Sequence, residues 1–335
     1  MQINLAKNEK EGIQLSLFSD DIVYEDLTVA VSEVKKSDNT VFPAENIKLY
    51  REYFSPSNVA EWDMPVDMHT LANALVPMEF ADLNKINTKI GENTTYYVKA
   101  ITSEDTPAGG YSGTVTLTHS AGKIEIPINI TVWDFALPKS PYLSSDFLYW
   151  RNWADAFYGD ATTPAENEQL HKEAIKIFAD NRIIITDAGR TDVGYTQGNE
   201  LEYAKSVKCY MENNPVVTCF PGLLFFKSVY EVDVEKSLAL INAYREVGIL
   251  DKIFYYIVDE PWMEEHVLKT EAIGEFMRTY APDMWHYCTT FPDSKSYYGK
   301  RILDDINLWC SIIRCCNPQV MEEYKAKGSR FWGNS

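Results

Sequence analysis

Basic residues are scarce in this sequence. Of 335 residues, 31 are Lys or Arg and 49 are Asp or Glu, which gives a formal net charge of −18 at pH 7. Nucleic acids and anionic membrane surfaces are bound through clustered Lys and Arg side chains. The charge balance therefore argues against a nucleic acid or a charged membrane as the partner, and it bears on solubility more than on substrate.

Long apolar runs are missing too. No run approaches the roughly 20 residues of a transmembrane helix, so we expect no membrane span. The first residues, Met1–Leu5, lack the charged and apolar regions of a signal peptide. The protein is expected to be either cytoplasmic or a secreted or periplasmic protein whose signal peptide has been removed, with the second slightly favoured.

Cysteine is absent from the first 200 residues, and all six cysteines lie between 209 and 316. No spacing of Cys and His resembles a zinc site, so no metal site is expected. Adjacent Cys315 and Cys316 are poorly placed to form a disulfide with each other. We therefore expect the cysteines to be buried or free thiols.

Residues 1 to 138 predict a β domain. Apolar and polar residues alternate along short segments that Gly, Asn, Asp and Pro separate, as in half-buried strands. An antiparallel β-sandwich is the expected fold. The segments are 13–18, 27–32, 46–53, 95–101, 112–118 and 123–132. Residues 55 to 90, with Pro56, Pro65 and Pro77, predict a long, mostly irregular crossing that packs against the next domain.

Residues 141 to 335 predict alternating strands and helices. Strand-like runs lie at 147–150, 182–187, 216–220, 254–260, 284–290, 307–313 and 330–332. Such alternation without hairpins indicates a parallel sheet, and its many repeats favour a (β/α)₈ TIM-type barrel. A doubly wound sheet is the alternative, but no glycine-rich nucleotide loop follows any strand. Because a full barrel takes roughly 250 residues, we expect one that is truncated or open at its C-terminal end.

The stretch Phe254–Trp262 places two acids at the end of the fourth predicted strand. Five apolar or aromatic residues lead into Asp259 and Glu260, and Pro261 then suits the first position of a helix. Acids at the carboxyl end of a buried parallel strand lie where α/β enzymes keep their catalytic groups. Burial there would raise a carboxyl pKa toward that of a general acid. The structural alternative is an acid pair that only meets the positive end of the helix dipole.

The adjacency of the two acids limits their chemistry. Neighbouring residues on a strand point to opposite sides. Asp259 and Glu260 are therefore poorly placed to act as an ordinary acid-and-nucleophile pair, whose carboxyls lie roughly 5–5.5 Å apart around a glycosidic bond. They suit a mechanism in which one acid protonates the leaving group and the other orients a nucleophile that the substrate supplies. By the same alternation, Tyr256 should share a strand face with Glu260.

Five segments, taken in order over about 250 residues, resemble motifs of glycoside hydrolase family 123 and the related domain of unknown function 4091. No single motif is specific, and their order carries the resemblance. They are Ala6–Leu15 (AKNEKEGIQL), Ala72–Pro77 (ANALVP), Pro107–Gly113 (PAGGYSG), Val132–Pro138 (VWDFALP) and Asp259–Pro261 (DEP).

The resemblance implies a β-sandwich followed by a (β/α)₈ catalytic barrel. It also implies exo-acting hydrolysis, with retention, of terminal N-acetyl-β-galactosaminides in a glycan. Glu260 would be the acid/base, and Asp259 would hold the substrate's 2-acetamido group while its carbonyl oxygen attacks the anomeric carbon. The implied partner is a glycan that contains N-acetylhexosamine, and no metal or organic cofactor is implied.

Further candidates for substrate binding lie near predicted strand ends. Aromatic residues make up 13% of the chain, an excess that lines sugar sites in some proteins and large cores in others. The candidates are Trp150, Arg151, Trp153, Asp187, Tyr256, Trp262 and Trp309. Ordinary packing is the alternative for the aromatic residues and Arg151, and a helix cap is the alternative for Asp187. His286, within the fifth predicted strand, is expected to be a core histidine.

Two functions remain open from the sequence. The first is a retaining, substrate-assisted N-acetyl-β-galactosaminidase, which the acid pair and the order of motifs favour. The second is a carbohydrate-binding relative without turnover, which the short barrel favours. A glycosidase of another sugar specificity lies between them, and the oligomeric state carries no sequence signal.

Overall fold

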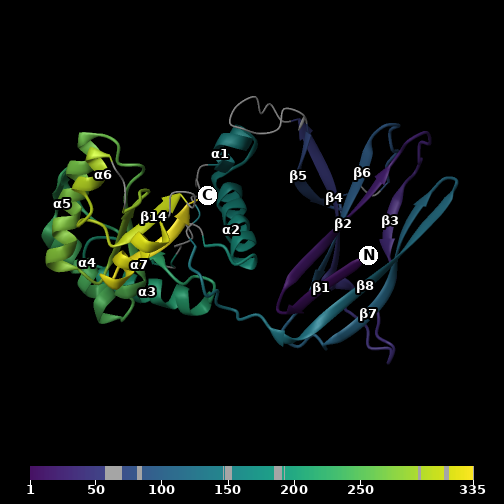
Figure 1. The fold of residues 1–335 in the computed structure, drawn as a ribbon, viewed down its shortest axis with the longest axis horizontal. Coiled ribbons are helices and arrows are strands. Elements are labelled where there is room, and N and C mark those ends of the chain that lie inside the picture. The colour runs from purple at the N-terminus through teal and green to yellow at the C-terminus, as the bar shows by residue number, and fades with distance from the viewer. Residues whose placement is uncertain are drawn as a thin grey trace. The chain divides into compact units, whose positions relative to one another are not determined.

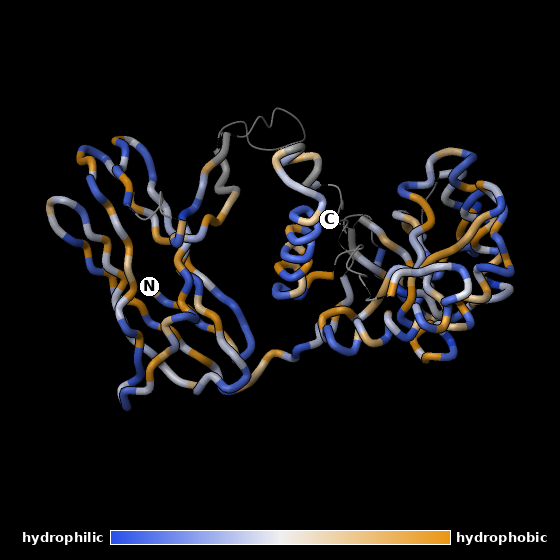
Figure 2. The backbone as a smooth tube through the Cα atoms, turned by 180° about the vertical axis from the view of Figure 1, so that it is seen from behind, coloured by the Kyte–Doolittle hydropathy of each residue, from blue (hydrophilic) through white to orange (hydrophobic). Residues whose placement is uncertain are grey.

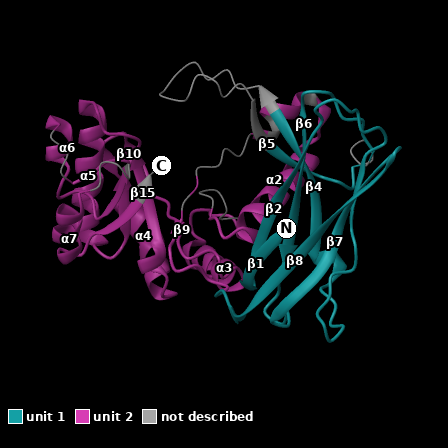
Figure 3. Cartoon of the chain, turned by 45° about the vertical axis from the view of Figure 1, so that its right-hand side comes forward, with its two compact units in different colours: residues 1–138 teal, residues 139–335 magenta. Residues whose placement is uncertain are grey.

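The computed structural model describes residues 1–56, 70–80, 85–145, 147, 153–184, 191, 193–292, 296–312 and 317–334. The chain divides into two compact units, Met1–Pro138 and Lys139–Ser335 (Figure 3). The sequence prediction placed its domain boundary between residues 138 and 141. The first unit is built of strands, and the second combines strands with helices, so the expected combination of a β domain with an α/β domain is confirmed.

The first unit consists of two four-stranded sheets, with strand orders β1-β8-β7-β3 and β2-β6-β4-β5 (Figure 1). The bounds are β1 Gln2–Lys7, β2 Lys10–Phe18, β3 Thr28–Val31, η1 Ala44–Asn46, β4 Ile47–Pro56, β5 Thr70–Pro77, β6 Asn93–Ile101, β7 Gly109–His119 and β8 Gly122–Ala136. One core contains buried residues of both sheets, including Val98 and Ala100 of β6 and Ile128 and Ile130 of β8. The two sheets therefore form a sandwich.

Strand alternation explains this core. Along β8, buried Ile128, Ile130 and Val132 take every second position, because successive side chains of a strand point to opposite faces. Figure 2 shows the alternation as orange and blue segments along the strands of the first unit. This periodicity is the signal from which the sequence predicted the sandwich.

Two expectations for the first unit were wrong. β1 was not predicted, and it pairs with β8 in parallel, so the sandwich is not wholly antiparallel. The segment expected to be mostly irregular holds β5 and the end of β4, which pair antiparallel. Pro56 and Pro77 stand at strand ends, and β5 is an edge strand, where proline disturbs no ladder. Residues 57–69 and 81–84, Pro65 among them, lie outside the described residues.

The second unit alternates helices with mostly parallel strands. Its helices are α1 Trp153–Tyr158, η3 Gly159–Ala161, α2 Pro164–Asp180, α3 Glu200–Asn213, α4 Val234–Glu246, η4 Leu250–Lys252, α5 Glu264–Tyr280, α6 Tyr297–Arg301 and α7 Pro318–Ala326. Its strands are β9 Phe220–Pro221, β10 Phe226–Ser228, β11 Glu231–Val232, β12 Ile253–Val258, β13 Trp285–Cys288, β14 Leu308–Ile312 and β15 Arg330–Asn334.

Parallel pairing joins β13-β12-β9 in one sheet and β14-β15 in another, as the alternation predicted. The hairpin of β10 and β11 was not predicted. Of the strands expected at 147–150 and 182–187, the structure describes only Phe147 and residues 182–184, and the Phe147 N–H donates to the Ile184 carbonyl oxygen at 2.9 Å. The described strands do not close a barrel.

β12 is apolar along its length because both of its faces are covered. Ile253 and Ile257 join a core with residues of α5 such as Val267, whereas Phe254 packs with Tyr287 and other residues on the opposite face. A strand buried on both sides shows a continuous apolar run instead of alternation. The carboxyl end of β12 leads directly into Asp259 and Glu260.

The burial of His286 in β13 predicts how the stability of this core depends on pH. The side chain is only 3% exposed, its Nδ1 lies 3.1 Å from the Met284 carbonyl oxygen, and burial lowers its pKa to about 4. In the unfolded chain the histidine has an ordinary pKa near 6.5, so between pH 4 and 6.5 the unfolded chain binds a proton at His286 more readily than the folded chain does. The free energy of unfolding should therefore be largest above pH 6.5 and fall by about 3 kcal/mol as pH drops to 4.

Urea unfolding of the full chain measures this, followed by tryptophan fluorescence, because six of the eight tryptophans lie after residue 138. His286→Gln should remove most of the histidine part of the pH dependence, whereas His119→Gln in the first unit should keep it. An identical pH profile for wild type and His286→Gln would show that His286 does not titrate in this way.

Candidate active site

β12 contains a β-bulge near its carboxyl end. Tyr256 pairs with Tyr287 of β13, but the next pair is Val258 with Cys288, so Ile257 is the extra residue. A bulge turns the side chains that follow it, and bulges are frequent beside active sites. Strict alternation predicted that Tyr256 would share a face with Glu260. The structure corrects this, because Tyr256 meets Asp259 instead.

Three hydrogen bonds organise the acid pair. The Tyr256 hydroxyl donates to Asp259 Oδ1 at 2.9 Å, and the Thr289 hydroxyl donates to the same oxygen at 2.6 Å. The backbone N–H of Glu260 donates to Thr289 Oγ1 at 2.6 Å. Thr289 directly follows β13, so the carboxyl ends of two paired parallel strands meet here. That edge is where ligand sites of α/β folds form.

The backbone at Glu260 is strained. Its φ is +39°, in the left-handed region that residues with a Cβ seldom adopt. Pro261, which follows, is buried, and α5 begins only at Glu264, after Met263 as N-cap. The sequence predicted that a helix follows the acid pair, and the structure confirms this helix, although Pro261 lies before it and not in its first turn. Strained residues held by their surroundings are typical of functional sites.

The electrostatics of the site differ from the expectation. Both Asp259 and Glu260 are exposed, so the burial that was expected to act on them is not found in the described part of the chain. Burial does act on Tyr256, where it raises the pKa of the phenol, and the hydrogen bond to Asp259 raises it further. The ring of Tyr256 stacks on Tyr287, with centroids 4.6 Å apart. Tyr256 is therefore a fixed, protonated donor at neutral pH.

A small pocket of about 190 Å³ adjoins Glu260. It is lined by Glu260, Pro261, Trp262, Thr289, Thr290, Phe291 and Cys310. The Trp262 side chain is 64% exposed, and its ring contacts His266 edge-on at 5.9 Å between centroids. The structure thus brings Trp262, a candidate from the sequence, beside the acid pair with a ring open to a ligand.

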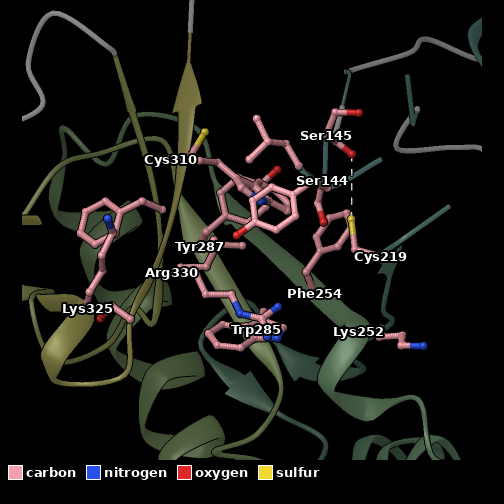
Figure 4. Close-up of a pocket in the computed structure, with 16 residues that line it drawn as sticks. Ser144, Ser145, Cys219, Lys252, Phe254, Trp285, Tyr287, Cys310, Lys325 and Arg330 are labelled. Atoms are coloured by element: carbon pink, nitrogen blue, oxygen red, sulfur yellow. Dashed lines mark hydrogen bonds between the residues drawn. The ribbon is translucent and has the colours of Figure 1, made fainter. Parts of the chain in front are cut away.

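A larger hollow of about 670 Å³ is lined by other residues and does not include either acid. Figure 4 shows its lining, with Phe254, Trp285, Tyr287 and Arg330 among the side chains. The Arg330 guanidinium lies 3.8 Å from the centre of the Trp285 ring. Phe254, Trp285 and Arg330 lie at or next to the N-terminal ends of their strands, and neither acid lines the hollow, so its volume does not mark the acid site.

The remaining candidates are placed differently. Trp309 is fully buried against Tyr324, with ring centroids 5.3 Å apart, so it is wrong as a platform for a sugar. It lies on the face of β14 that packs on helices. Trp153 lies half-buried in α1, where its ring contacts that of Tyr158, and its role stays a prediction. Trp150, Arg151 and Asp187 lie outside the described residues.

Sequence reasoning missed Thr289. The signal was present, because Thr289 and Thr290 are polar residues that follow an apolar strand, as Asp259 does. Within the described ranges, no three His, Cys, Asp or Glu side chains are grouped so that they could hold a metal ion. No described helix is long and apolar enough to cross a membrane.

The fold is similar to that of a family 123 glycoside hydrolase from Clostridium perfringens. The two align with a TM-score of 0.66 and 8% sequence identity over 98% of this chain and 67% of that chain. A candidate β-galactosidase from Bacteroides fragilis aligns over 98% of this chain and 45% of its own length, at 11% identity. Its TM-score of 0.30 is too low to indicate a shared fold. No family model and no curated protein matches the chain. The predicted resemblance to family 123 is therefore confirmed at the level of the fold.

The strain at Glu260 predicts that a glycine variant at this position is more stable than an alanine variant. Glycine adopts a positive φ freely, so Glu260→Gly should be more stable than Glu260→Ala by about 1 kcal/mol, although both remove the carboxylate. Urea unfolding measures the difference. At exposed Glu265 in α5 the order should reverse, because glycine disfavours a helix. Alanine equal to or better than glycine at both positions would contradict the strain.

Proposed function

We propose that this protein is a retaining, substrate-assisted glycoside hydrolase that removes terminal N-acetyl-β-galactosamine from glycans. The observation that carries the proposal is the acid pair after β12, in which Asp259 is fixed by two hydrogen bonds while adjacent Glu260 lines a pocket. The fold shared with a family 123 glycoside hydrolase supports it. So does the order of the sequence motifs.

The arrangement of Asp259 favours a nucleophile from the substrate. One of its oxygens already accepts two hydrogen bonds, so the group is better suited to hold a partner than to attack one. Two consecutive residues are also poorly placed to flank a glycosidic bond as an ordinary carboxylate pair does. We assign Asp259 to the N–H of the substrate's 2-acetamido group, which turns the acetamido carbonyl oxygen toward the anomeric carbon.

In the first step, the acetamido oxygen forms a bond to the anomeric carbon while the glycosidic bond breaks. Glu260 gives its proton to the departing oxygen, and a cyclic oxazoline-type intermediate remains. In the second step, water attacks the anomeric carbon, Glu260 takes a proton from that water, and the ring bond to the acetamido oxygen breaks. Two inversions at one carbon give retention. The reaction as proposed uses no metal and no organic cofactor.

Trp262 is assigned to the sugar-binding surface. Its exposed ring stands beside Glu260 in the small pocket, and an aromatic face packs well against the C–H face of a sugar ring. Tyr256 acts through Asp259, because its hydroxyl is committed to Oδ1. Of the candidates from the sequence, these two therefore join the acid pair.

The exposure of both carboxylates supports a second candidate function. An exposed acid pair lacks the water-excluded setting that strengthens catalysis, which suits a protein that binds carbohydrate without turning it over. A glycosidase acting on another sugar is a third candidate, because the acid pair alone does not select the configuration at C4.

The hydrolase proposal predicts the effect of removing the acid/base. Wild type should hydrolyse 4-nitrophenyl N-acetyl-β-galactosaminide, and Glu260→Gln should lower kcat by about 10²- to 10⁴-fold, because the amide can neither give nor take the proton. Glu265→Gln, which changes a nearby exposed acid of α5, should leave kcat unchanged. Equal rates for wild type and Glu260→Gln would refute the assignment.

Two further measurements separate the candidates. The 2-deoxy substrate, which lacks the acetamido group, should not be hydrolysed if that group takes part. Glycan binding by calorimetry with no hydrolysis would favour the binding protein. A higher rate on a different aryl glycoside would identify another sugar specificity, and binding to no glycan would count against all three functions.

A further inference from the structure

Thr289 forms hydrogen bonds with both acids of the pair. It follows β13 directly, and β13 pairs in parallel with β12 up to Cys288 and Val258. This pairing sets the Thr289 hydroxyl 2.6 Å from Asp259 Oδ1 and 2.6 Å from the backbone nitrogen of Glu260. Threonine is β-branched, so its side chain has few rotamers to choose from and holds such a position well.

The direction of these hydrogen bonds follows from the groups themselves. The backbone N–H of Glu260 can only donate, so Thr289 Oγ1 must accept from it. The hydroxyl has a single proton, which is therefore free to point at Asp259 Oδ1, and a carboxylate oxygen can only accept. The order Glu260 N–H, Thr289 O–H, Asp259 Oδ1 is thus fixed, and it links the backbone of one acid to the carboxylate of the other.

The same bonds distinguish the two oxygens of Asp259. In the described structure, the hydrogen bonds to this carboxylate from Tyr256 and Thr289 both end on Oδ1. Hydrogen bonds from two different elements define the plane of the carboxylate, because Tyr256 comes from within β12 and Thr289 from the end of β13. Among the described residues no hydrogen bond ends on Oδ2, so this oxygen can accept one from a ligand.

We propose that Thr289 is a positioning residue for this reaction, which presents Asp259 Oδ2 to the acetamido N–H of the substrate and holds the backbone of Glu260 in its left-handed conformation. The role rests on the proposed function and deepens it. Thr289 itself transfers no proton. Its contribution falls on the attack by the acetamido oxygen, and so it is specific to substrates that carry a 2-acetamido group.

The test compares Thr289→Val, which keeps the shape and removes the hydroxyl, with Thr289→Ser, which keeps the hydroxyl. Two substrates are used, the 4-nitrophenyl and 2,4-dinitrophenyl N-acetyl-β-galactosaminides. The second leaving group departs without a proton, so it bypasses the acid role of Glu260 but not the attack by the acetamido oxygen. Melting temperatures of the full chain show that the variants fold, and Thr289→Ala replaces the valine variant if that one does not.

Thr289→Val should lower kcat by about 10- to 100-fold on both substrates, as expected for a hydrogen bond to a charged group, with a smaller change in KM. Thr289→Ser should stay within about threefold of wild type. Glu260→Gln should lose kcat on the 4-nitrophenyl substrate and recover most of it in the formation of the intermediate from the 2,4-dinitrophenyl substrate, measured as a burst of released phenol.

Three results would overturn the role of Thr289 while leaving the proposed function standing. They are an unchanged kcat in Thr289→Val, an equal loss in Thr289→Ser, and a loss in Thr289→Val that the better leaving group restores. A wild-type chain that hydrolyses neither substrate would instead refute the proposed function, and the role of Thr289 with it.

Discussion

The parallel pairing of β12 with β13 is the constraint on which the site depends. It brings Thr289 beside Asp259, and the bulge at Ile257 turns Asp259 toward Tyr256. In a regular strand with no bulge, alternation would have placed Glu260 on the same face as Tyr256. The chemistry assigned to each acid therefore follows from the register of two strands, and both strands are held in place by the aliphatic and aromatic residues that cover them.

The strand that carries the acid pair could be predicted from the sequence, but the contacts around the two acids could not. The unbroken apolar run before Asp259 predicted a buried parallel strand, because coverage on both faces leaves no polar position, and the structure has that strand. Thr289 was missed because a threonine after a strand is common, and its contact with Asp259 depends on register between segments 30 residues apart. The bulge has no composition of its own, so the partner of Tyr256 could not be predicted.

Aromatic residues and prolines show the limits of reading single positions. Trp262 and Trp309 both stand near strand ends in the sequence, yet one is 64% exposed and the other is fully buried. Trp309 lies within β14 and packs in the core against Tyr324, whereas Trp262 lies in the segment between β12 and α5. The prolines between 55 and 90 suggested irregular structure, but Pro56 is the last residue of β4 and Pro77 is the last residue of the edge strand β5, positions where proline is tolerated.

The central claim is that Asp259 and Glu260 direct an attack by the substrate's own acetamido group. The anomer first released from an aryl N-acetyl-β-galactosaminide, observed by proton NMR before mutarotation, tests it most directly. Two inversions at the anomeric carbon predict that β-N-acetylgalactosamine forms first and that the α-anomer appears later. Initial release of the α-anomer would require direct attack by water and would contradict the account.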